Sequence, residues 1–150
     1  MLKIFLKILL VLVTFFYIPF GYGEEIFLSL KKNKVNVRYG PGFDFPVKYI
    51  YKKINLPVIQ IDKKENFRRI IDIKNNSGWV HISQLKKINS TIVLEDKILF
   101  EKPSFFSQPI AKIKKGRLLI IRNCEKKWCK IETNKFKGWV YKENLWGSVN

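Results

Sequence analysis

The sequence predicts an all-β protein in which two tandem small β-barrels follow an N-terminal signal peptide. Three observations support this: an apolar N-terminal block, a motif that recurs after 60 residues, and short β-branched or aromatic runs bounded by turn residues. Of the 150 residues, 47% are apolar and 15% are aromatic, which excludes a disordered tail. The length suits one ordinary domain or two very small ones.

The first 23 residues form a separate compositional block. Lys3 and Lys7 precede an uncharged apolar run over residues 8–20, and the small residues Gly21 and Gly23 follow it. This order of charge, apolar segment and cleavage site predicts a signal peptide over residues 1–23, cleaved near Gly23. The alternative is an uncleaved membrane anchor, although the run is shorter than the roughly 20 residues that span a bilayer. We expect a periplasmic or secreted protein that meets the membrane only during export.

The chain is strongly basic, with 29 Lys and Arg against 12 Asp and Glu and a formal net charge of +17. Loss of Lys3 and Lys7 with the signal peptide lowers the charge by two, to +15. Such a chain is attracted to polyanions, and export removes nucleic acid from the expected partners. The abundance of Lys, Ile, Asn and Phe is also the composition that codon bias in an A/T-rich genome gives, so the sequence leaves open how much of the basicity has a function. The basic pairs are scattered along the chain, which favours a solvated positive surface over one defined polyanion site.

The mature chain contains a duplicated unit. Residues 78–85 begin Gly-Trp-Val and end in Leu, and residues 138–145 repeat these four identities in place. Self-similarity at one period indicates a repeated structural unit. We predict one barrel over residues 26–88 and a second over residues 89–150. Because no Gly/Ser/Pro-rich spacer separates them, a rigid two-barrel body is favoured over flexibly linked domains.

Each unit is predicted to consist of short strands and turns. In the first unit the strands fall at 35–38, 47–54, 57–61, 67–73 and 79–80, with turn residues at 39–42 and 75–78. In the second unit the matching strands fall at 110–113, 118–121, 128–133 and 138–141, and residues 90–94 form a further strand. Residues 86–90 are polar and suit a linker. Five short strands are too few for a broad sandwich, and they can close into a small barrel that leaves no exposed edges.

The combination of these motifs resembles bacterial SH3-like domains, and more closely the exported tandem SH3-like proteins of alphaproteobacteria. The resemblance covers nearly the whole mature chain. It rests on residues 35–38, 40–42, 56–58, 67–72, 78–81 and 145–147, and on Cys124, Trp128 and Cys129. It implies the fold and export, and it implies no particular ligand.

The chain departs from the family pattern at three places. Asn55 stands where a glycine is usual, and Asn75 and Asn76 replace a more acidic Asp-Gly turn. The second repeat carries residues 99–103 in place of the Asn-x-Arg-x-Gly-Pro-Gly signature, so a ligand role shared by both repeats is not implied.

Cys124 and Cys129 flank the tip of a predicted hairpin. In an oxidising compartment they are expected to form a cross-hairpin disulfide. The alternatives are two reduced thiols or pairing between chains. The spacing is not Cys-x-x-Cys, which argues against a redox role.

Six side chains are candidates for ligand binding. They are Arg38, Tyr39, Phe43, Phe45, Trp79 and Trp139. The two tryptophans offer flat apolar faces to a peptide or sugar, and the loop aromatics suit a groove that docks extended chains. Arg38 could clamp a carboxylate. The structural alternatives are packing of the tryptophans over the barrel ends, packing of the loop aromatics within the loop, and a salt bridge from Arg38 to Asp44 or Asp72.

The sequence argues against an enzyme. His81 is the single histidine, and Tyr141 takes its place in the second repeat, so a solvent-facing strand residue is favoured over a general base. One His and two Cys are too few for a zinc site of the usual kind, and we expect no metal and no cofactor. The two predicted barrels leave no room in this chain for a catalytic domain.

We therefore expect an exported, non-catalytic binding protein that binds cell-wall peptides or an extended segment of a partner protein in the cell envelope. The alternative is a structural adaptor that assembles envelope proteins without a small ligand. A third and less favoured possibility is that the protein is an accessory part of a cell-wall hydrolase system.

Overall fold

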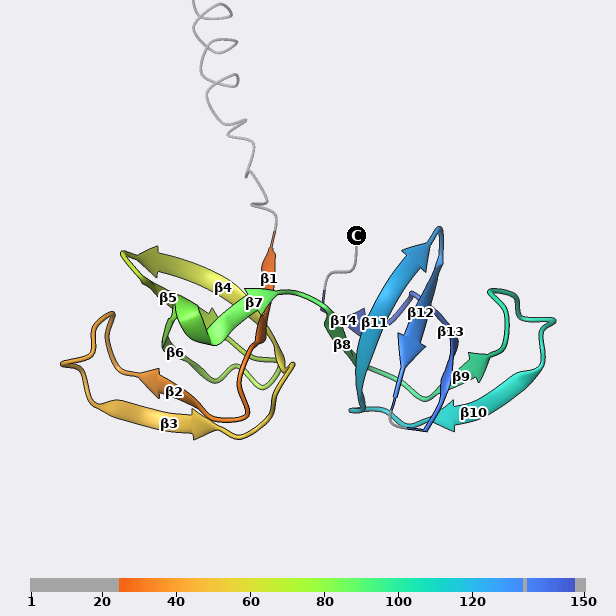
Figure 1. Ribbon diagram of the computed structural model, residues 1–150, viewed down its shortest axis with the longest axis horizontal. Helices are drawn as coiled ribbons and strands as arrows, with labels where there is room; N and C mark the ends of the chain where they lie inside the picture. The colour runs from red at the N-terminus through yellow and green to blue at the C-terminus, as the bar shows by residue number, and fades with distance from the viewer. Residues whose placement is uncertain (1–24, 134, 148–150) are drawn as a thin grey trace, which may run out of the picture.

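The computed structural model describes residues 25–133 and 135–147, which form two seven-stranded antiparallel sheets (Figure 1). The all-β fold with two tandem small barrels is confirmed. The predicted signal peptide over residues 1–23 lies outside the described residues. Among the described residues, no helix has the length and apolar character needed to cross a bilayer.

The first barrel begins at the N-terminal end of the described chain. Its strands are β1 (Ile26–Leu30), β2 (Val35–Arg38), β3 (Val47–Tyr51), β4 (Pro57–Lys64), β5 (Phe67–Ile71), β6 (Ser77–His81) and, after the 3₁₀ turn Ile82–Gln84, β7 (Leu85–Lys87). They are ordered β3-β2-β6-β5-β4-β1-β7. Alternate strand residues point inward, and the resulting core contains Leu30, Val35, Val37, Val58, Ile70, Val80 and Leu85.

The second barrel has the same strand order. Its strands are β8 (Ser90–Val93), β9 (Lys97–Phe100), β10 (Pro109–Ile113), β11 (Leu118–Glu125), β12 (Trp128–Glu132), β13 (Lys137–Tyr141) and β14 (Leu145–Trp146), in the order β10-β9-β13-β12-β11-β8-β14. Its core contains Val93, Leu99, Ile113, Leu119, Cys129, Ile131 and Val140. The duplication seen in the sequence is therefore a duplication of the whole sheet.

Two expectations about the strands were wrong. Each sheet has seven strands rather than five, because β1 and the very short β7 are added in the first sheet and β9 and the very short β14 in the second. The expected linker over residues 86–90 is mostly strand, since Lys86 and Lys87 belong to β7 and β8 starts at Ser90. Only two residues connect the barrels.

The glycine of the repeated Gly-Trp-Val motif allows two strands to approach closely. A Cβ atom on Gly138 would lie 2.6 Å from the carbonyl oxygen of Phe100, and one on Gly78 would lie 3.0 Å from the carbonyl oxygen of Arg38 and would overlap Val37. The following Trp is then held on the outer face of the sheet, directly opposite the last residue of β2 or β9. This explains why both repeats keep a glycine at this point.

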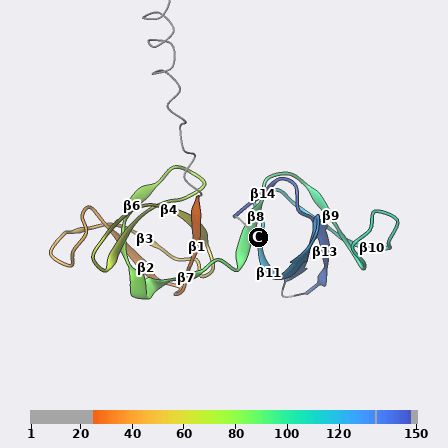
Figure 2. The ribbon, with the colours of Figure 1, turned by 90° about the horizontal axis from the view of Figure 1, so that it is seen from above.

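The barrels contact each other where β1 and β4 of the first meet β8 and β14 of the second (Figure 2). The buried hydroxyls of Ser29 and Ser90 lie 2.8 Å apart, and the Ser90 hydroxyl donates to the carbonyl oxygen of Asn55 at 2.6 Å. The rings of Phe27 and Trp146 meet edge to face, with centroids 5.3 Å apart. The outer sides of β1 and β8 are thus taken up by contact between the barrels.

Candidate functional site

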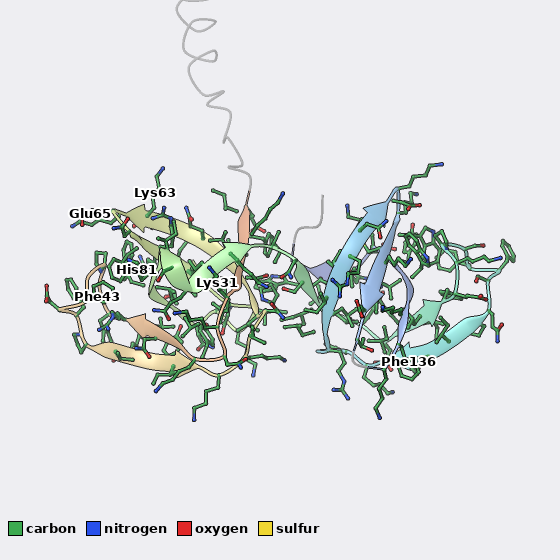
Figure 3. All side chains as sticks on the ribbon, viewed as in Figure 1. Lys31, Phe43, Lys63, Glu65, His81 and Phe136 are labelled. Atoms are coloured by element: carbon green, nitrogen blue, oxygen red, sulfur yellow. A yellow bond between two sulfur atoms is a disulfide. The ribbon has the colours of Figure 1, made fainter. Side chains whose placement is uncertain are left out.

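The outer face of the first barrel carries a cluster that we call the first aromatic surface: Arg38, Phe43, Phe67, Trp79 and His81. β5 and β6 pair Phe67 with His81, so both rings leave the same face of the sheet, 5.2 Å apart. Phe43 comes from the loop between β2 and β3 and lies 5.2 Å from Phe67 and 5.1 Å from His81. Figure 3 shows Phe43 and His81 together at the outer end of the barrel. Phe67 is buried beneath Phe43, whose side chain is 63% exposed.

Arg38 fixes the loop that carries Phe43. Its Nη1 donates to the carbonyl oxygens of Phe43 at 3.1 Å and Phe45 at 2.7 Å, and its guanidinium carbon lies 5.5 Å from the centre of the Phe43 ring. Among the described residues Arg38 forms no ion pair, so the expected alternative of a salt bridge to Asp44 or Asp72 was wrong. Both hydrogen bonds use Nη1, and within the described part of the chain Nη2 and Nε keep their N–H groups for a further acceptor.

Trp79 lies between two arginines on this surface. The strand register sets it directly opposite Arg38 on β2 and Arg69 on β5. Direct cross-strand partners leave the same face of a sheet. The row Arg38–Trp79–Arg69 therefore combines an apolar ring with a guanidinium on either side, which is suited to an extended chain that bears carboxylates.

His81 has a structural contact that accounts for its position. Its Nδ1 accepts the backbone N–H of Ser83 at 3.3 Å, and the Ser83 hydroxyl lies 2.8 Å from the same nitrogen. His81 is thereby the N-cap of the short turn Ile82–Gln84. The ring is half-buried against Phe43 and Phe67, so the expectation of a simply solvent-facing residue needs refinement.

The second barrel rebuilds the same arrangement with different side chains. Its second aromatic surface comprises Phe100, Phe105, Trp128, Tyr141 and, opposite Phe100, Trp139. The Phe105 ring lies 4.7 Å from Trp128, 5.1 Å from Tyr141 and 6.0 Å from Phe100. Trp128 also contacts Phe100 and Tyr141 at 5.7 and 5.5 Å.

The register gives the correspondence between the two surfaces. Phe100 pairs with Trp139 as Arg38 pairs with Trp79, and Trp128 pairs with Tyr141 as Phe67 pairs with His81. The aromatic ring of Phe100 thus takes the place of the Arg38 guanidinium. In both views the loops after β2 and β9 lie at opposite ends of the molecule (Figures 1 and 2), so the surfaces that they help to form are far apart.

The candidate residues from the sequence divide between the two surfaces. Arg38, Phe43 and Trp79 lie on the first and Trp139 on the second, where the Lys130 ammonium is 5.8 Å from its ring centre. Tyr39 stays 64% exposed beneath the Lys48 ammonium at 5.7 Å. Phe45 packs its ring onto Gly40 within the loop.

Sequence reasoning missed part of each surface. The residues missed are Phe67, Arg69, Phe100, Phe105, Trp128 and Tyr141, with His81 set aside as a surface residue. Two signals in the sequence could have identified them. Strand alternation predicts which side chains face outward. The repeat also relates Phe105, in the loop between β9 and β10, to Phe43, which holds the same place in the loop between β2 and β3.

A buried carboxylate shapes the turn before Trp79. Asp72 accepts hydrogen bonds from the backbone N–H groups of Lys74 and Asn76 and from the hydroxyl of Tyr51 at 2.9 Å. Burial by itself would raise the pKa of Asp72, but the hydrogen bonds, above all those from Asn76, lower it further than burial raises it. Burial raises the pKa of Tyr51, and the bond to the Asp72 carboxylate adds to this. The turn is therefore built around an ionised carboxylate.

The predicted disulfide is present between Cys124 and Cys129. The two residues are direct partners across the β11–β12 hairpin, with Cα atoms 4.0 Å apart. Cys129 is fully buried in the core of the second barrel. The bond thus ties the β11–β12 hairpin just behind its turn, next to Trp128 on the second aromatic surface.

Charge is organised differently in the two barrels. The five ion pairs found within residues 25–133 and 135–147 all lie in the second barrel, where Asp96 and Glu132 each hold two cations. Arg122 and Lys137 lower the pKa of Glu132. In the same part of the chain, no group of three or more His, Cys, Asp or Glu side chains could hold a metal ion.

Comparison with known proteins identifies the family. No curated protein matches the sequence. Two solved structures, NlpC2 and NlpC1 from Trichomonas vaginalis, are 15% and 14% identical, with TM-scores of 0.39. The matches cover 85% and 83% of this chain but only 50% and 46% of those proteins, so the chain spans about half their length. The family model described as bacterial SH3 domain matches twice, at residues 31–87 and 96–147. With one match on each barrel, the chain belongs to the bacterial SH3 domain family.

Proposed function

We propose that this protein is an exported, non-catalytic binding protein whose first aromatic surface docks extended cell-wall peptides with free carboxylates. The observation that carries the proposal is the row Arg38–Trp79–Arg69 beside the ordered Phe43 loop. Arg38 is already held in place by two backbone carbonyls, so little side-chain freedom is lost when it receives a carboxylate. A net charge of +15 after loss of the signal peptide adds attraction to an anionic wall.

The proposal of a binding role without catalysis has support from His81. Its Nδ1 is occupied by Ser83, and among the described residues its hydrogen bonds include no carboxylate that would orient the ring as a base. The close Ser83 hydroxyl belongs to the turn that His81 caps. Measurable hydrolysis of wall material by the purified chain, abolished in His81→Ala, would contradict this part of the proposal.

Export is supported by the apolar block at residues 8–20 and by the Cys124–Cys129 disulfide, because disulfides persist in oxidising compartments. Fractionation of cells expressing the full chain is expected to recover it in the periplasm or medium, shortened at its N-terminus. Recovery at full length in the cytoplasm would contradict export.

The binding role is tested by retention on purified cell-wall sacculi at low salt. The unmodified chain should be retained, and Phe43→Ala should weaken retention by about tenfold, the size expected for a central aromatic contact. Arg38→Lys keeps the charge but loses the planar fork and should weaken retention as well.

Phe136→Ala is the matched control, because Phe136 is a 44% exposed aromatic residue that belongs to neither aromatic surface (Figure 3). It should bind as the unmodified chain does. Absence of retention of the unmodified chain, or equal loss in the control, would exclude the wall peptide as ligand.

The alternative is an adaptor between envelope proteins. The observation that favours it is the second aromatic surface, where the phenyl ring of Phe100 stands in the place of the Arg38 guanidinium. Crosslinking in cells that captures protein partners and no wall fragments would support the adaptor in place of wall binding.

A further inference from the structure

We infer that the second aromatic surface is a separate docking surface for a partner protein, and that its occupant is a short extended segment with an apolar or aromatic side chain beside a carboxylate. The inference concerns the second barrel and goes beyond the proposed function, which uses the first. Three observations support it: the exposed aromatic residues in the loop after β9, the apolar character of the rings beneath that loop, and the charged groups beside the rings.

The loop after β9 holds two phenylalanines in solvent. Phe105 is 61% exposed, and Phe106 is completely exposed. The loop is nevertheless well ordered by its own hydrogen bonds: the Ser104 hydroxyl accepts the Phe106 N–H at 3.2 Å, and the Ser107 hydroxyl accepts the Lys102 N–H at 2.9 Å. Neighbouring exposed aromatic side chains in a fixed loop form the kind of apolar patch that marks an interaction site.

The rings beneath this loop favour an apolar anchor. Phe100 occupies the position that Arg38 holds in the first barrel, so no formal charge lies among Phe100, Phe105, Trp128 and Tyr141. A carboxylate at the centre would be desolvated without a partner, whereas an apolar side chain adds to the ring contacts. These four rings therefore disfavour a carboxylate, which is the group that the first aromatic surface is proposed to bind.

Charged groups of both signs stand beside the rings. The Lys130 ammonium lies 5.8 Å from the centre of the Trp139 ring, whereas Glu125 is the direct cross-strand partner of Trp128 and adds a carboxylate at that side of the surface. A carboxylate next to the apolar anchor would therefore be favoured on the Trp139 side, where it meets Lys130. An extended peptide supplies both groups on neighbouring residues.

Other occupants fit less well. A second copy of the exported chain would bring two molecules of charge +15 together. A sugar ring stacks on an open aromatic face, but Phe100 meets Phe105 and Trp128 edge to face, at interplanar angles of 89° and 88°. Such a surface suits a side chain that inserts between rings more than a flat ring that lies on one.

The test begins with a library of random 12-residue linear peptides displayed on phage and selected on the full oxidised chain. A selected peptide is then synthesised, and its Kd is measured by fluorescence anisotropy for the unmodified chain and three variants: Phe105→Ala, Phe43→Ala and Phe136→Ala. Circular dichroism and the urea unfolding midpoint verify that each variant is folded. Phe106→Ser, at a completely exposed side chain, is the second variant if Phe105→Ala fails to fold.

The expected result is a consensus that combines an aromatic or large aliphatic residue with Asp or Glu. Phe105→Ala or Phe106→Ser should weaken its binding about tenfold, while Phe43→Ala and Phe136→Ala change it less than twofold. Sacculus retention should be unchanged in Phe105→Ala, so failure of the wall proposal and failure of this one are distinguishable.

Three results would overturn the inference. The first is the absence of any enriched peptide, or peptides that bind Phe105→Ala as tightly as the unmodified chain. The second is self-association of the unmodified chain, seen by sedimentation and lost in Phe106→Ser, which would make a second copy the occupant. The third is loss of sacculus retention in Phe105→Ala, which would assign this surface to the wall polymer.

Discussion

The two barrels share one strand order but place different chemistry at equivalent points of it. Both keep a core of aliphatic side chains and a glycine that lets two strands approach. On the outer face, Arg38 of the first barrel corresponds to Phe100 of the second. The inward-facing side of a duplicated sheet is constrained by packing, whereas its outer face is free to take a different ligand.

The barrels also differ in how their hairpins are secured. The first barrel closes its β5–β6 turn around the Asp72 carboxylate, and the second closes the matching turn around the Thr133 hydroxyl, which accepts the Phe136 N–H at 3.0 Å. The second barrel has an additional constraint, because the disulfide joins the two strands of its β11–β12 hairpin. The first barrel therefore secures a turn with an ionised group and the second secures a hairpin with a covalent bond, so protonation of Asp72 should act on the first barrel and reductant on the second.

The largest effect is expected from Gly78→Ala and Gly138→Ala. Each added methyl group overlaps a strand that is fixed in the sheet, and we expect each to cost about 3 kcal/mol or more of unfolding free energy. Urea unfolding measures the loss. Gly42→Ala is the control, because its Cβ would meet only the Phe45 side chain, at 3.3 Å. A small cost at one of the two positions would show that the close approach is needed in one barrel alone.

Reduction of the disulfide should have the next largest effect. Opening a loop of this size removes about 2 kcal/mol on the chain-entropy account. Hydrogen exchange should then accelerate at the amides of β11 and β12, with a smaller change in β4 and β5. The double variant Cys124→Ala with Cys129→Ala serves as control, because dithiothreitol should leave its exchange unaltered. Equal acceleration in both barrels would mean that they unfold as one unit.

Lowering the pH should weaken the first barrel through Asp72, while the exposed ion pairs of Glu132 in the second barrel add a smaller loss. The folded pKa of Asp72 lies below its ordinary value of 3.8, so its carboxylate stabilises the fold above that value and the contribution is lost as the pH falls through the lower, folded pKa. Asp72→Asn should cost about 1–2 kcal/mol at neutral pH. Its deficit relative to the unmodified chain should shrink in acid, as measured by urea midpoints between pH 7 and 2. A deficit independent of pH would show that the charge of Asp72 is not what stabilises the turn.

The smallest expected effect concerns ligand choice. Arg38→Phe gives the first surface the central side chain of the second, and it should reduce sacculus retention by about tenfold while leaving binding of the selected apolar peptide unchanged. Phe100→Arg is the reciprocal change and should weaken the apolar peptide. If neither exchange alters either ligand, the residue opposite the repeated tryptophan does not set specificity.

Much of the fold was predictable because the signals were local and occurred twice. Gly-Trp-Val at residues 78–80 and 138–140 marks a tight strand approach, and Cys124 and Cys129 flank a hairpin turn. Even the departure at Asn55 has a local explanation, since its φ of 61° is in the left-handed region that glycine favours and asparagine tolerates.

The aromatic surfaces were only partly predictable, because they depend on which strands become neighbours. Phe67 and Trp128 face outward on strands whose partners are set by sheet order, and a single sequence does not give that order. Phe100 stands where the family signature is lost, so the motif gave no reason to examine it. Strand alternation identifies rings that face outward. Whether such a ring contacts a loop residue such as Phe43 depends on the loop conformation, which Arg38 fixes by its hydrogen bonds to two loop carbonyl oxygens.

The packed contact between β1 and β8 has a mechanical consequence. Since the Ser29 and Ser90 hydroxyls and the Phe27 and Trp146 rings join the barrels, and only two residues connect β7 to β8, we expect the two barrels to keep a fixed position relative to each other. Ligands bound at the two aromatic surfaces would then be held at a constant distance.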